Sequence, residues 1–280
     1  MRERVETFDD PRLIDYRNIR DAQLLTDHRI FVAEGRLVVT RLLRSRRFAT
    51  RSVLVTPAAR TMLADVLATR DDLPVYEVAQ ETMNGVAGFD IHRGCLAIGE
   101  RGDPLDPLEL AATGSCLLGL ERIANPDNVG GLFRNAVAFG VDAMVLDRAT
   151  ADPLYRKALR TSVAAALDVP FARSASWPDT LTTCRRSGLR LVALTPHQDA
   201  REWREIAPSL HDERVMLVVG HEGDGLSEAT LSACEFRARV AVAPAVDSLN
   251  VSTAAAIALY ELRRTQRDHH FTSARPDGSC

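Results

Sequence analysis

The chain has 280 residues, of which 46% are apolar and 26% are charged. This composition is ordinary for a folded protein, so it excludes a chain that is disordered throughout and allows one large domain or two modest ones. The net charge of −3 argues mildly against a nucleic-acid-binding protein, because such proteins often carry an excess of basic residues.

Residues 1–100 mix helical and extended patterns, which predicts a small α/β domain. Apolar spacing suited to helices covers residues 12–27, 34–46 and 58–69. Short β-rich segments lie at residues 52–57, 75–78 and 95–99.

Residues 36–51 contain six arginines and no acidic residue. The whole of residues 1–100 is neutral by comparison, with fifteen basic and fifteen acidic residues. A phosphate-binding patch would stand out from its background in this way, although a solvated helix face would also carry such charges. The candidate RNA-binding residues are Arg36, Arg41, Arg44, Arg46, Arg47 and Arg51.

Residues 101–114 are rich in proline, glycine and acid, which predicts a linker. The following residues, 115–266, alternate between continuous apolar runs and helical patterns. Apolar runs without alternation indicate strands buried on both faces, and therefore a parallel sheet covered by helices. The last residues, 267–280, form a polar tail that we expect to fray.

The predicted strands of this second domain lie at residues 116–120, 142–147, 189–195, 215–220 and 237–243. The predicted helices lie at residues 128–140, 153–166, 177–187, 200–207, 227–234 and 250–264. In sheets of this type, ligands bind at the carboxyl ends of the strands, and the polar loops of this chain fall at those ends.

The first such loop, residues 121–140, follows a buried strand and opens a helix. Asn128 is predicted to cap this helix, with Asp127 adding negative charge at its positive end. Arg134 falls on the exposed side, away from the apolar stripe. Taken alone, the segment could equally be a capped surface helix with a solvated arginine.

The second loop, residues 218–227, carries three glycines in six positions with Glu222 among them. Glycines let the backbone approach a ligand closely, although Gly-rich strand–helix turns also occur without function. In the third loop, residues 242–262, polar residues stand at the start of a predicted helix that is apolar almost all round and rich in alanine. Such a helix must be buried, against its own core or against a second subunit.

The five cysteines are an odd number and show neither a CxxC pattern nor a Cys/His ligand spacing. This predicts no zinc site and no disulfide framework, and it fits a reducing cytoplasm. The N-terminal residues MRERVETFDD lack the apolar segment of a signal peptide, and no apolar run is long enough to span a bilayer. We therefore expect a cytoplasmic protein with no metal and no membrane partner.

Together the three loops resemble the three motifs of the SpoU/TrmH RNA 2′-O-ribose methyltransferases of the SPOUT superfamily. The motif N-x-G-x-x-x-R is matched at residues 128–134, G-x-E-G-x-G-L at 220–226 and S-L-N-V-S-x-A-A-A at 248–256. The usual I-P-M tripeptide is replaced by residues 240–242, and its following glycine by Pro244.

This resemblance implies a SPOUT-type parallel sheet with a deep trefoil knot, a homodimer formed through the C-terminal domain, and a small L30e-like N-terminal domain that binds the RNA substrate. It implies S-adenosylmethionine as the cofactor. The catalytic residues it implies are Asn128, Arg134, Glu222, Ser248 and Asn250. The cofactor-binding residues it implies are Thr195, Pro196, Gly220, Val240, Val242 and Leu249.

In the family, Arg134 would assist deprotonation of the ribose hydroxyl; binding of the adjacent phosphate is the alternative, because a guanidinium stays protonated. An NAD-dependent oxidoreductase and an ordinary Rossmann-type methyltransferase both lack support, since no G-x-G-x-x-G follows the first strand of the second domain. An inactive RNA-binding factor of the same fold remains an alternative. The separate N-terminal domain favours ribosomal RNA over transfer RNA as the substrate.

Overall fold

The computed structural model describes residues 2–17, 21–87, 91, 94–243, 245–246 and 248–273. The chain forms two compact units. The first comprises Met1–Asp103 with Asp152–Asp168, and the second comprises Pro104–Ala151 with Val169–Cys280. Pro244 and residues 274–280 of the predicted tail lie outside the described residues.

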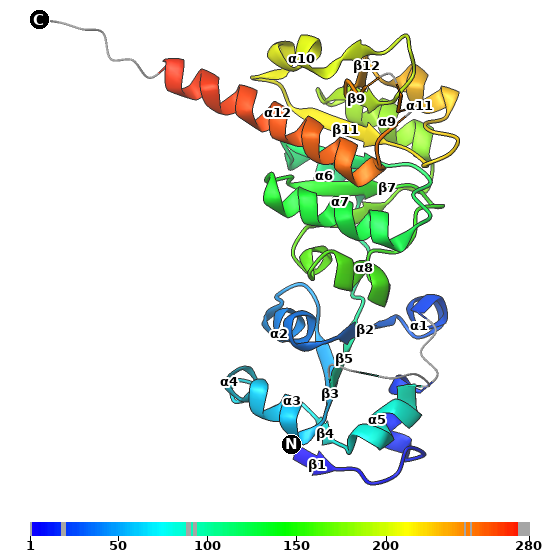
Figure 1. The fold of residues 1–280 in the computed structure, drawn as a ribbon, viewed down its shortest axis with the longest axis vertical. Coiled ribbons are helices and arrows are strands. Elements are labelled where there is room, and N and C mark those ends of the chain that lie inside the picture. The colour runs from blue at the N-terminus through cyan, green and yellow to red at the C-terminus, as the bar shows by residue number, and fades with distance from the viewer. Residues whose placement is uncertain are drawn as a thin grey trace, which may run out of the picture. The chain divides into compact units, whose positions relative to one another are not determined.

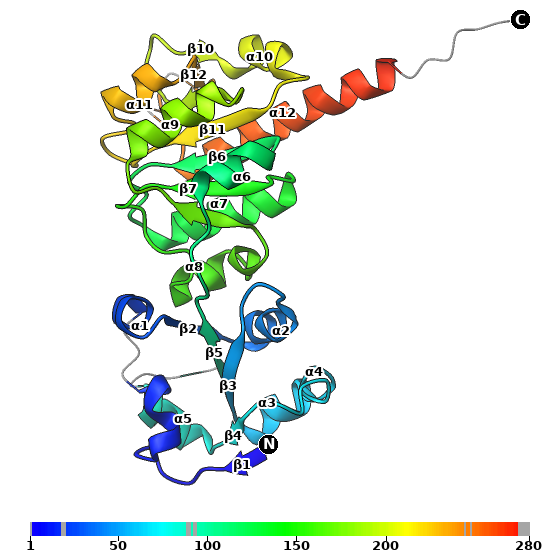
Figure 2. The same cartoon turned by 180° about the vertical axis from the view of Figure 1, so that it is seen from behind.

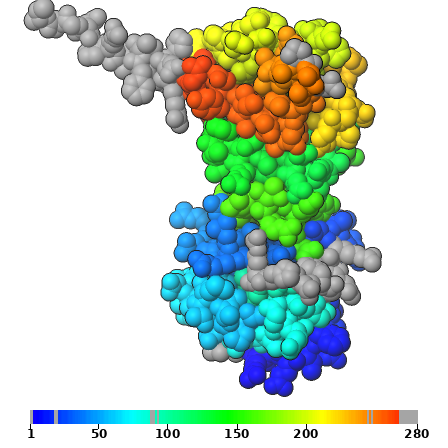
Figure 3. Space-filling view, in the orientation of Figure 1, coloured from blue at the N-terminus to red at the C-terminus, as the bar shows by residue number. Residues whose placement is uncertain are grey.

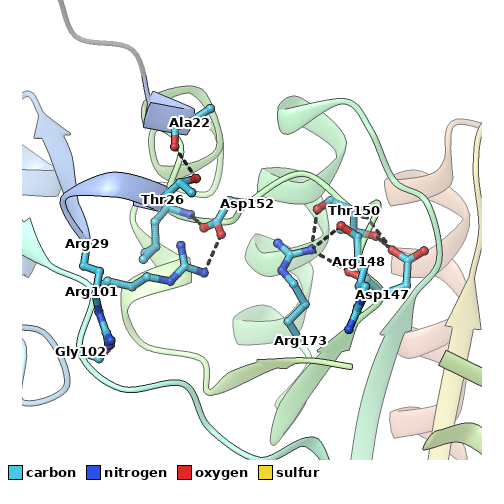
Figure 4. Close-up of polar contacts among 11 residues, drawn as sticks. Ala22, Thr26, Arg29, Arg101, Gly102, Asp147, Arg148, Thr150, Asp152 and Arg173 are labelled. Atoms are coloured by element: carbon cyan, nitrogen blue, oxygen red, sulfur yellow. Dashed lines mark hydrogen bonds and ion pairs between the residues drawn. The ribbon is translucent and has the colours of Figure 1, made fainter. Parts of the chain in front are cut away.

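Two features of this division differ from the sequence-based prediction. The predicted linker contains a helix, α6 (Pro107–Thr113), whose first turn is capped by Asp106 through the backbone N–H of Leu108. Residues 152–168, predicted as part of the second domain, belong to the first unit. An ion pair of 2.6 Å between Arg101 and Asp152 helps to hold them there (Figure 4).

The first unit is built on a five-stranded sheet with the order β1-β4-β3-β5-β2. Strand β5 is antiparallel to β2 and β3, and the remaining pairs are parallel. The strands are β1 (Arg2–Arg4), β2 (Ile30–Glu34), β3 (Thr50–Val55), β4 (Val75–Glu77) and β5 (Cys95–Glu100).

The helices of this unit are short. They are η1 (Pro11–Tyr16), α1 (Asp21–Asp27), α2 (Arg36–Arg44), α3 (Pro57–Met62), α4 (Ala64–Leu67), α5 (Gln80–Ala87), α8 (Arg156–Thr161) and η2 (Ala165–Leu167). Strands β1 and β2 were not predicted. The predicted helix over residues 58–69 is divided at Leu63, whose φ of −103° is not helical.

On one face of the sheet in the first unit, Leu54, Leu96 and Ile98 pack with Leu13 and Tyr16. Strand residues that point to the other face, such as Phe31, Val53 and Val55, are buried as well. The buried hydroxyl of Tyr16 makes a hydrogen bond of 2.7 Å with Ser52, which satisfies a polar group that would otherwise be costly to bury. Burial raises the pKa of Tyr16 well above its usual value, so this hydroxyl stays protonated.

The second unit is built on a seven-stranded sheet with the order β10-β12-β9-β11-β6-β7-β8, in which every neighbouring pair is parallel. This confirms the predicted α/β class. The strands are β6 (Cys116–Leu120), β7 (Ala143–Leu146), β8 (Phe171–Arg173), β9 (Arg190–Leu194), β10 (Arg201–Glu202), β11 (Val215–Val219) and β12 (Phe236–Arg239).

Helices cover both faces of this sheet (Figures 1 and 2). One face carries α6, α9 (Trp177–Arg186) and α11 (Glu228–Ala233), which bury the alternate strand residues Leu117, Leu191 and Met216. The other carries α7 (Pro126–Ala138) and α12 (Val251–Ser273), which pack against each other. Both faces of the central strands are therefore buried, as their continuous apolar runs predicted.

Two helices of the second unit differ from the prediction. Residues 200–207, predicted as one helix, form β10, a single turn α10 (Trp203–Ile206) and the start of η3 (Ala207–Leu210). Helix α12 was predicted to end at residue 264 but continues to Ser273, through the first part of the predicted polar tail. Among the described residues, no helix is both long enough and apolar enough to cross a membrane.

Candidate active site

The three loops singled out in the sequence meet at the carboxyl edge of the second unit's sheet. Asn128 lies in the first turns of α7, Glu222 lies in the loop after β11, and Asn250 immediately precedes α12. The side-chain amide of Asn128 donates a hydrogen bond to Glu222. The side-chain amide of Asn250 donates to the side-chain oxygen Oδ1 of Asn128 at 2.8 Å. One buried asparagine thus joins all three loops.

Asn128 is not the helix cap that the sequence predicted. Helix α7 begins two residues earlier, with Pro126 in its first turn, and Asn125 caps it by accepting the N–H of Asp127 at 2.9 Å. Proline suits the first helical position because it has no N–H to leave unsatisfied. Asn128 is therefore inside the helix, where its side chain is free to bind the other two loops.

Helices α7 and α12 approach each other closely next to this network. A Cβ atom on Gly131 would lie 2.9 Å from the Cβ and Oγ atoms of Ser252, so only glycine allows this packing. One turn further along α7, the amide of Asn135 donates to the backbone oxygen of Ser252 at 2.6 Å. Asn250 in turn accepts hydrogen bonds from the backbone N–H and hydroxyl of Ser252 at 3.0 and 2.7 Å.

The loop after β11 is closed on itself. A Cβ atom on Gly220 would lie 2.7 Å from backbone atoms of Gly225 and Leu226, so residue 220 must be glycine for the loop to fold back. The loop after β6 also holds it from outside. Arg122 donates to the backbone oxygen of Gly225 at 3.1 Å, and the buried Glu121 accepts the N–H of Ser227 at 3.1 Å.

A pocket of about 450 Å³ lies between the ends of β9, β11 and β12. Its walls include all six residues that the motif resemblance assigned to a cofactor, namely Thr195, Pro196, Gly220, Val240, Val242 and Leu249. Glu222 and Ser248 also line it. The pocket therefore opens next to the hydrogen-bonded network of Asn128.

The structure does not bring the other two predicted catalytic residues into that network. Ser248 lines the pocket, but its side chain makes no hydrogen bond to any residue that the structure describes. Arg134 lies on α7 with an exposed side chain, and within the described residues its guanidinium has no hydrogen-bond or ion-pair partner. Arg134 is therefore available to a ligand that this chain alone does not supply.

Thiol chemistry is not favoured in the second unit, whose described cysteines do not line the pocket. Burial raises the pKa of Cys116 and of Cys184 to about 11 and that of Cys234 to about 12, so none of these thiols is ionised at neutral pH. Across the described residues, no group of three or more His, Cys, Asp or Glu side chains could hold a metal ion.

The loop after β7 is also fixed by polar contacts (Figure 4). The guanidinium of Arg173 donates to the backbone oxygens of Asp147, Arg148 and Thr150, at 2.7, 3.3 and 2.8 Å. The hydroxyl of Thr150 donates to the backbone oxygen of Leu120 and accepts the N–H of Ile123, both at 3.2 Å. These bonds fix the chain between β6 and α7.

The predicted arginine cluster of the first unit divides into two kinds of residue. Arg41 pairs with Asp168 at 2.9 Å, and Arg51 pairs with Asp15 and Glu100 at 3.1 and 3.2 Å. The side chain of Arg47 lies over the ring of Phe48, and desolvation lowers its pKa to about 10. The remaining three, Arg36, Arg44 and Arg46, are exposed, and their guanidinium groups have no partner in the described part of the chain.

Sequence reasoning missed several residues of this edge. Gln198, Glu202 and Arg239 line the pocket. Glu202 lies in strand β10, which was missed because the sequence predicted a helix over residues 200–207. Arg122, which holds the Gly-rich loop, has a positive φ of 56°. No local signal marks an arginine for that conformation, so only the fold could reveal it.

Comparisons with known proteins agree on one family. The sequence profile described as "SpoU rRNA Methylase family" matches residues 115–260. A Mycobacterium bovis protein named "Uncharacterized tRNA/rRNA methyltransferase" is 41% identical over 267 residues, which cover 94% of this chain and 91% of that protein. The Bacillus subtilis protein named "23S rRNA (guanosine(2553)-2′-O)-methyltransferase RlmP" is 27% identical and covers 92% of this chain and 98% of its own.

Comparison with solved structures gives a similar result. The crystal structure described as an AdoMet-bound rRNA methyltransferase from Sinorhizobium meliloti matches with a TM-score of 0.79 at 24% identity. The match covers 94% of this chain and 98% of that one. The shared architecture therefore includes both units of the chain.

Proposed function

Because the chain belongs to the SpoU rRNA Methylase family, we propose that it transfers a methyl group from S-adenosylmethionine to a ribose 2′-hydroxyl of RNA, with ribosomal RNA as the substrate. The observation that carries the proposal is the meeting of three motif loops at Asn128, beside a pocket lined by all six residues expected to hold the cofactor. RNA methylation is the activity named both for the family and for the mycobacterial relative.

The pocket fits a nucleoside-sized ligand. Its volume of about 450 Å³ is within the range of small-molecule sites. Val240, Val242 and Leu249 offer apolar surface for a flat base, and the backbone of the closed loop at Gly220 offers polar groups at close range. S-adenosylmethionine supplies an electrophilic methyl group when bound, and the protein supplies position and electrostatics.

Asn128, Glu222 and Asn250 hold the reacting ribose in our proposal. Their mutual hydrogen bonds fix the three loops before substrate arrives, and such preorganisation lowers the barrier to an in-line transfer. Arg134 binds the phosphate next to the reacting ribose and stabilises the negative charge that develops on the 2′-oxygen of that ribose. Both roles need only a charged, planar guanidinium. Ser248 contacts the ribose from the wall of the pocket.

RNA binding involves the first unit. We assign phosphate binding chiefly to Arg36, Arg44 and Arg46, whose guanidinium groups are exposed and have no partner among the residues described. Arg41, Arg47 and Arg51 belong to the same predicted cluster, but they are already engaged by carboxylates or by an aromatic ring. The ribosomal RNA named for the Bacillus subtilis relative, together with the separate first unit, supports an rRNA substrate.

We further propose a homodimer formed through α12. Helix α12 lies at the surface of the chain (Figure 3), where Ile257 and Tyr260 are 38% and 54% exposed. Large apolar side chains exposed on one helix favour a protein partner. Sedimentation at micromolar concentration should give a dimer, and a stable monomer would contradict this assignment. A C-terminal trefoil knot, an L30e-like first unit and a cytoplasmic location complete the proposal.

The function is tested with the purified protein, labelled S-adenosylmethionine and two RNA pools. We expect transfer to ribosomal RNA lacking the modification and none to transfer RNA. Mapping of ribose methylation in cells with and without the gene should then locate one nucleotide. Transfer to tRNA alone would identify the alternative substrate, and cofactor binding without transfer to either RNA would indicate an inactive RNA-binding factor.

A further inference from the structure

One side chain in the Gly-rich loop has a role that none of the motif residues covers. His221 stands between Gly220, which lines the pocket, and Glu222, which binds Asn128. Its ring is half-buried, and it lines the pocket itself. The loop it belongs to must therefore satisfy two demands at once, a wall for the cofactor and a carboxylate for the network.

The ring nitrogen Nδ1 of His221 accepts two backbone hydrogen bonds. They come from the N–H of Gly223 at 3.0 Å and the N–H of Asp224 at 3.1 Å. In a neutral imidazole only one nitrogen accepts, so these bonds place the ring proton on Nε2. The side chain of His221 thus bonds to the two residues that follow Glu222 and holds the turn in its conformation.

Other bonds hold the two ends of the turn, but none replaces those at Nδ1. The backbone oxygen of His221 accepts the N–H of Gly225 at 3.0 Å. Arg122 reaches Gly225 from the loop after β6 and lies 3.6 Å from the carboxylate of Asp224. Without the ring, the N–H groups of Gly223 and Asp224 would have to find water. The loop could then rearrange easily, because Gly223 and Gly225 allow many backbone conformations.

We propose that His221 is a positioning residue for the proposed methyl transfer: through its Nδ1 atom it sets the shape of residues 220–225, and thereby both the cofactor wall at Gly220 and the direction of Glu222. This inference rests on the proposed function, because it names what holds that site in place. His221 takes no proton and donates none in this role. What matters is an acceptor atom at the position of Nδ1.

The test uses three substitutions that separate the acceptor from the ring. In His221→Asn the Oδ1 atom occupies nearly the position of Nδ1, whereas in His221→Gln the acceptor lies further out, near the position of Nε2. His221→Ala has no acceptor. His211→Ala is the matched control, since it removes an imidazole of the same unit whose Nδ1 lies 2.9 Å from the backbone oxygen of Pro208.

Two measurements are made on each full-length variant. Hydrogen exchange reports the amides of Gly223 and Asp224 and requires no cofactor. Calorimetry reports the Kd for S-adenosylmethionine. We expect His221→Ala and His221→Gln to exchange both amides faster and to bind the cofactor about 10-fold more weakly, as the loss of two hydrogen bonds predicts. His221→Asn and His211→Ala should stay within about 2-fold of the parent protein in affinity.

The outcomes separate the inference from the function on which it rests. If the parent protein binds no S-adenosylmethionine, the proposed function fails, while the exchange of Gly223 and Asp224 still tests the role of His221 in the loop. If the parent binds and His221→Asn is as weak as His221→Ala, the ring itself is what matters and the inference is overturned. Equal affinity and equal exchange in all variants would overturn it as well.

Discussion

The network of the second unit and the arginines of the first unit use polar side chains in contrasting ways. Asn128, Glu222 and Asn250 come from three loops and hold one another by hydrogen bonds, so each has one geometry. The arginines between residues 36 and 51 are spread along α2 and into β3, and only some are engaged by partners. Group transfer needs atoms at fixed positions, whereas an RNA backbone needs positive charge at approximate positions. We therefore expect substitutions in the network of the second unit to lower the rate of methyl transfer, and substitutions of the arginines in the first unit to lower the affinity for RNA.

The largest effect is expected at Arg134, on the same helix as Asn128. Arg134→Ala should lower methyl transfer at least about 100-fold, the usual cost of removing a group that stabilises transition-state charge. The Kd for S-adenosylmethionine should not change, because Arg134 does not line the pocket. Single-turnover transfer and calorimetry measure the two quantities separately.

Arg134→Lys sharpens this prediction. An ammonium keeps the charge but loses the planar pair of donors, so the lysine variant should also fail. Near-normal turnover in Arg134→Lys would show that charge alone is needed, and Arg134 would then resemble the arginines of the first unit.

A smaller effect is expected at Asn250, which both joins the network and accepts the N–H groups of Ser252 and Thr253 at the start of α12. Asn250→Ala loses both roles and should lower transfer about 10-fold and the free energy of unfolding by about 1–2 kcal/mol. Asn250→Asp keeps the oxygen that caps α12 but loses the donor to Asn128. It should lower transfer as much with a smaller loss of stability, measured by urea unfolding. Normal transfer in Asn250→Asp would show that the bond to Asn128 is not needed.

The smallest effect per residue is expected in the first unit. Replacing Arg36, Arg44 and Arg46 by alanine should weaken RNA binding and reduce the salt slope by about 0.7–0.9 for each phosphate that is no longer neutralised. Cofactor affinity and the single-turnover rate at saturating RNA should not change. RNA affinity measured at several salt concentrations gives the slope.

Arg41→Ala combined with Arg51→Ala is the matched control, since both arginines are already paired with carboxylates. This double variant should change the slope less than the triple variant does. If the triple variant kept both its affinity and its slope, the cluster would be a solvated surface, and RNA recognition would belong to the second unit.

The sequence was most informative where burial is simple. Strand β6 begins and ends where its apolar run predicted, at Cys116 and Leu120, because a strand covered on both faces has no polar residue. The sequence was misleading where two nearby residues were equally suitable for the same structural role. Asn125 and Asn128 are both suitable caps, and the decision depends on Pro126 and on the distant partners of Asn128. The arginines at residues 36–51, with no acid among them, predicted a phosphate-binding patch. Two of these arginines pair with carboxylates that lie far away in the sequence, those of Asp15, Glu100 and Asp168.

The motif residues could be named because the three loops resemble the motifs of a known family, and the structure brings Asn128, Glu222 and Asn250 together. The residues that support them could not be named. Arg122 and His221 act through backbone atoms of a loop, and such contacts depend on how the chain turns and not on which residue types it contains.

The close approach of α7 and α12 at Gly131 links two positions that are far apart in the sequence. An alanine at 131 would favour the helix intrinsically, yet its methyl group would meet both side-chain atoms of Ser252 at 2.9 Å. Replacing Ser252 with glycine removes those two atoms and opens the space. Relatives with this packing are therefore expected to vary in a correlated way, with glycine at one or the other of these two positions, so that one substitution becomes tolerable only after its counterpart has occurred.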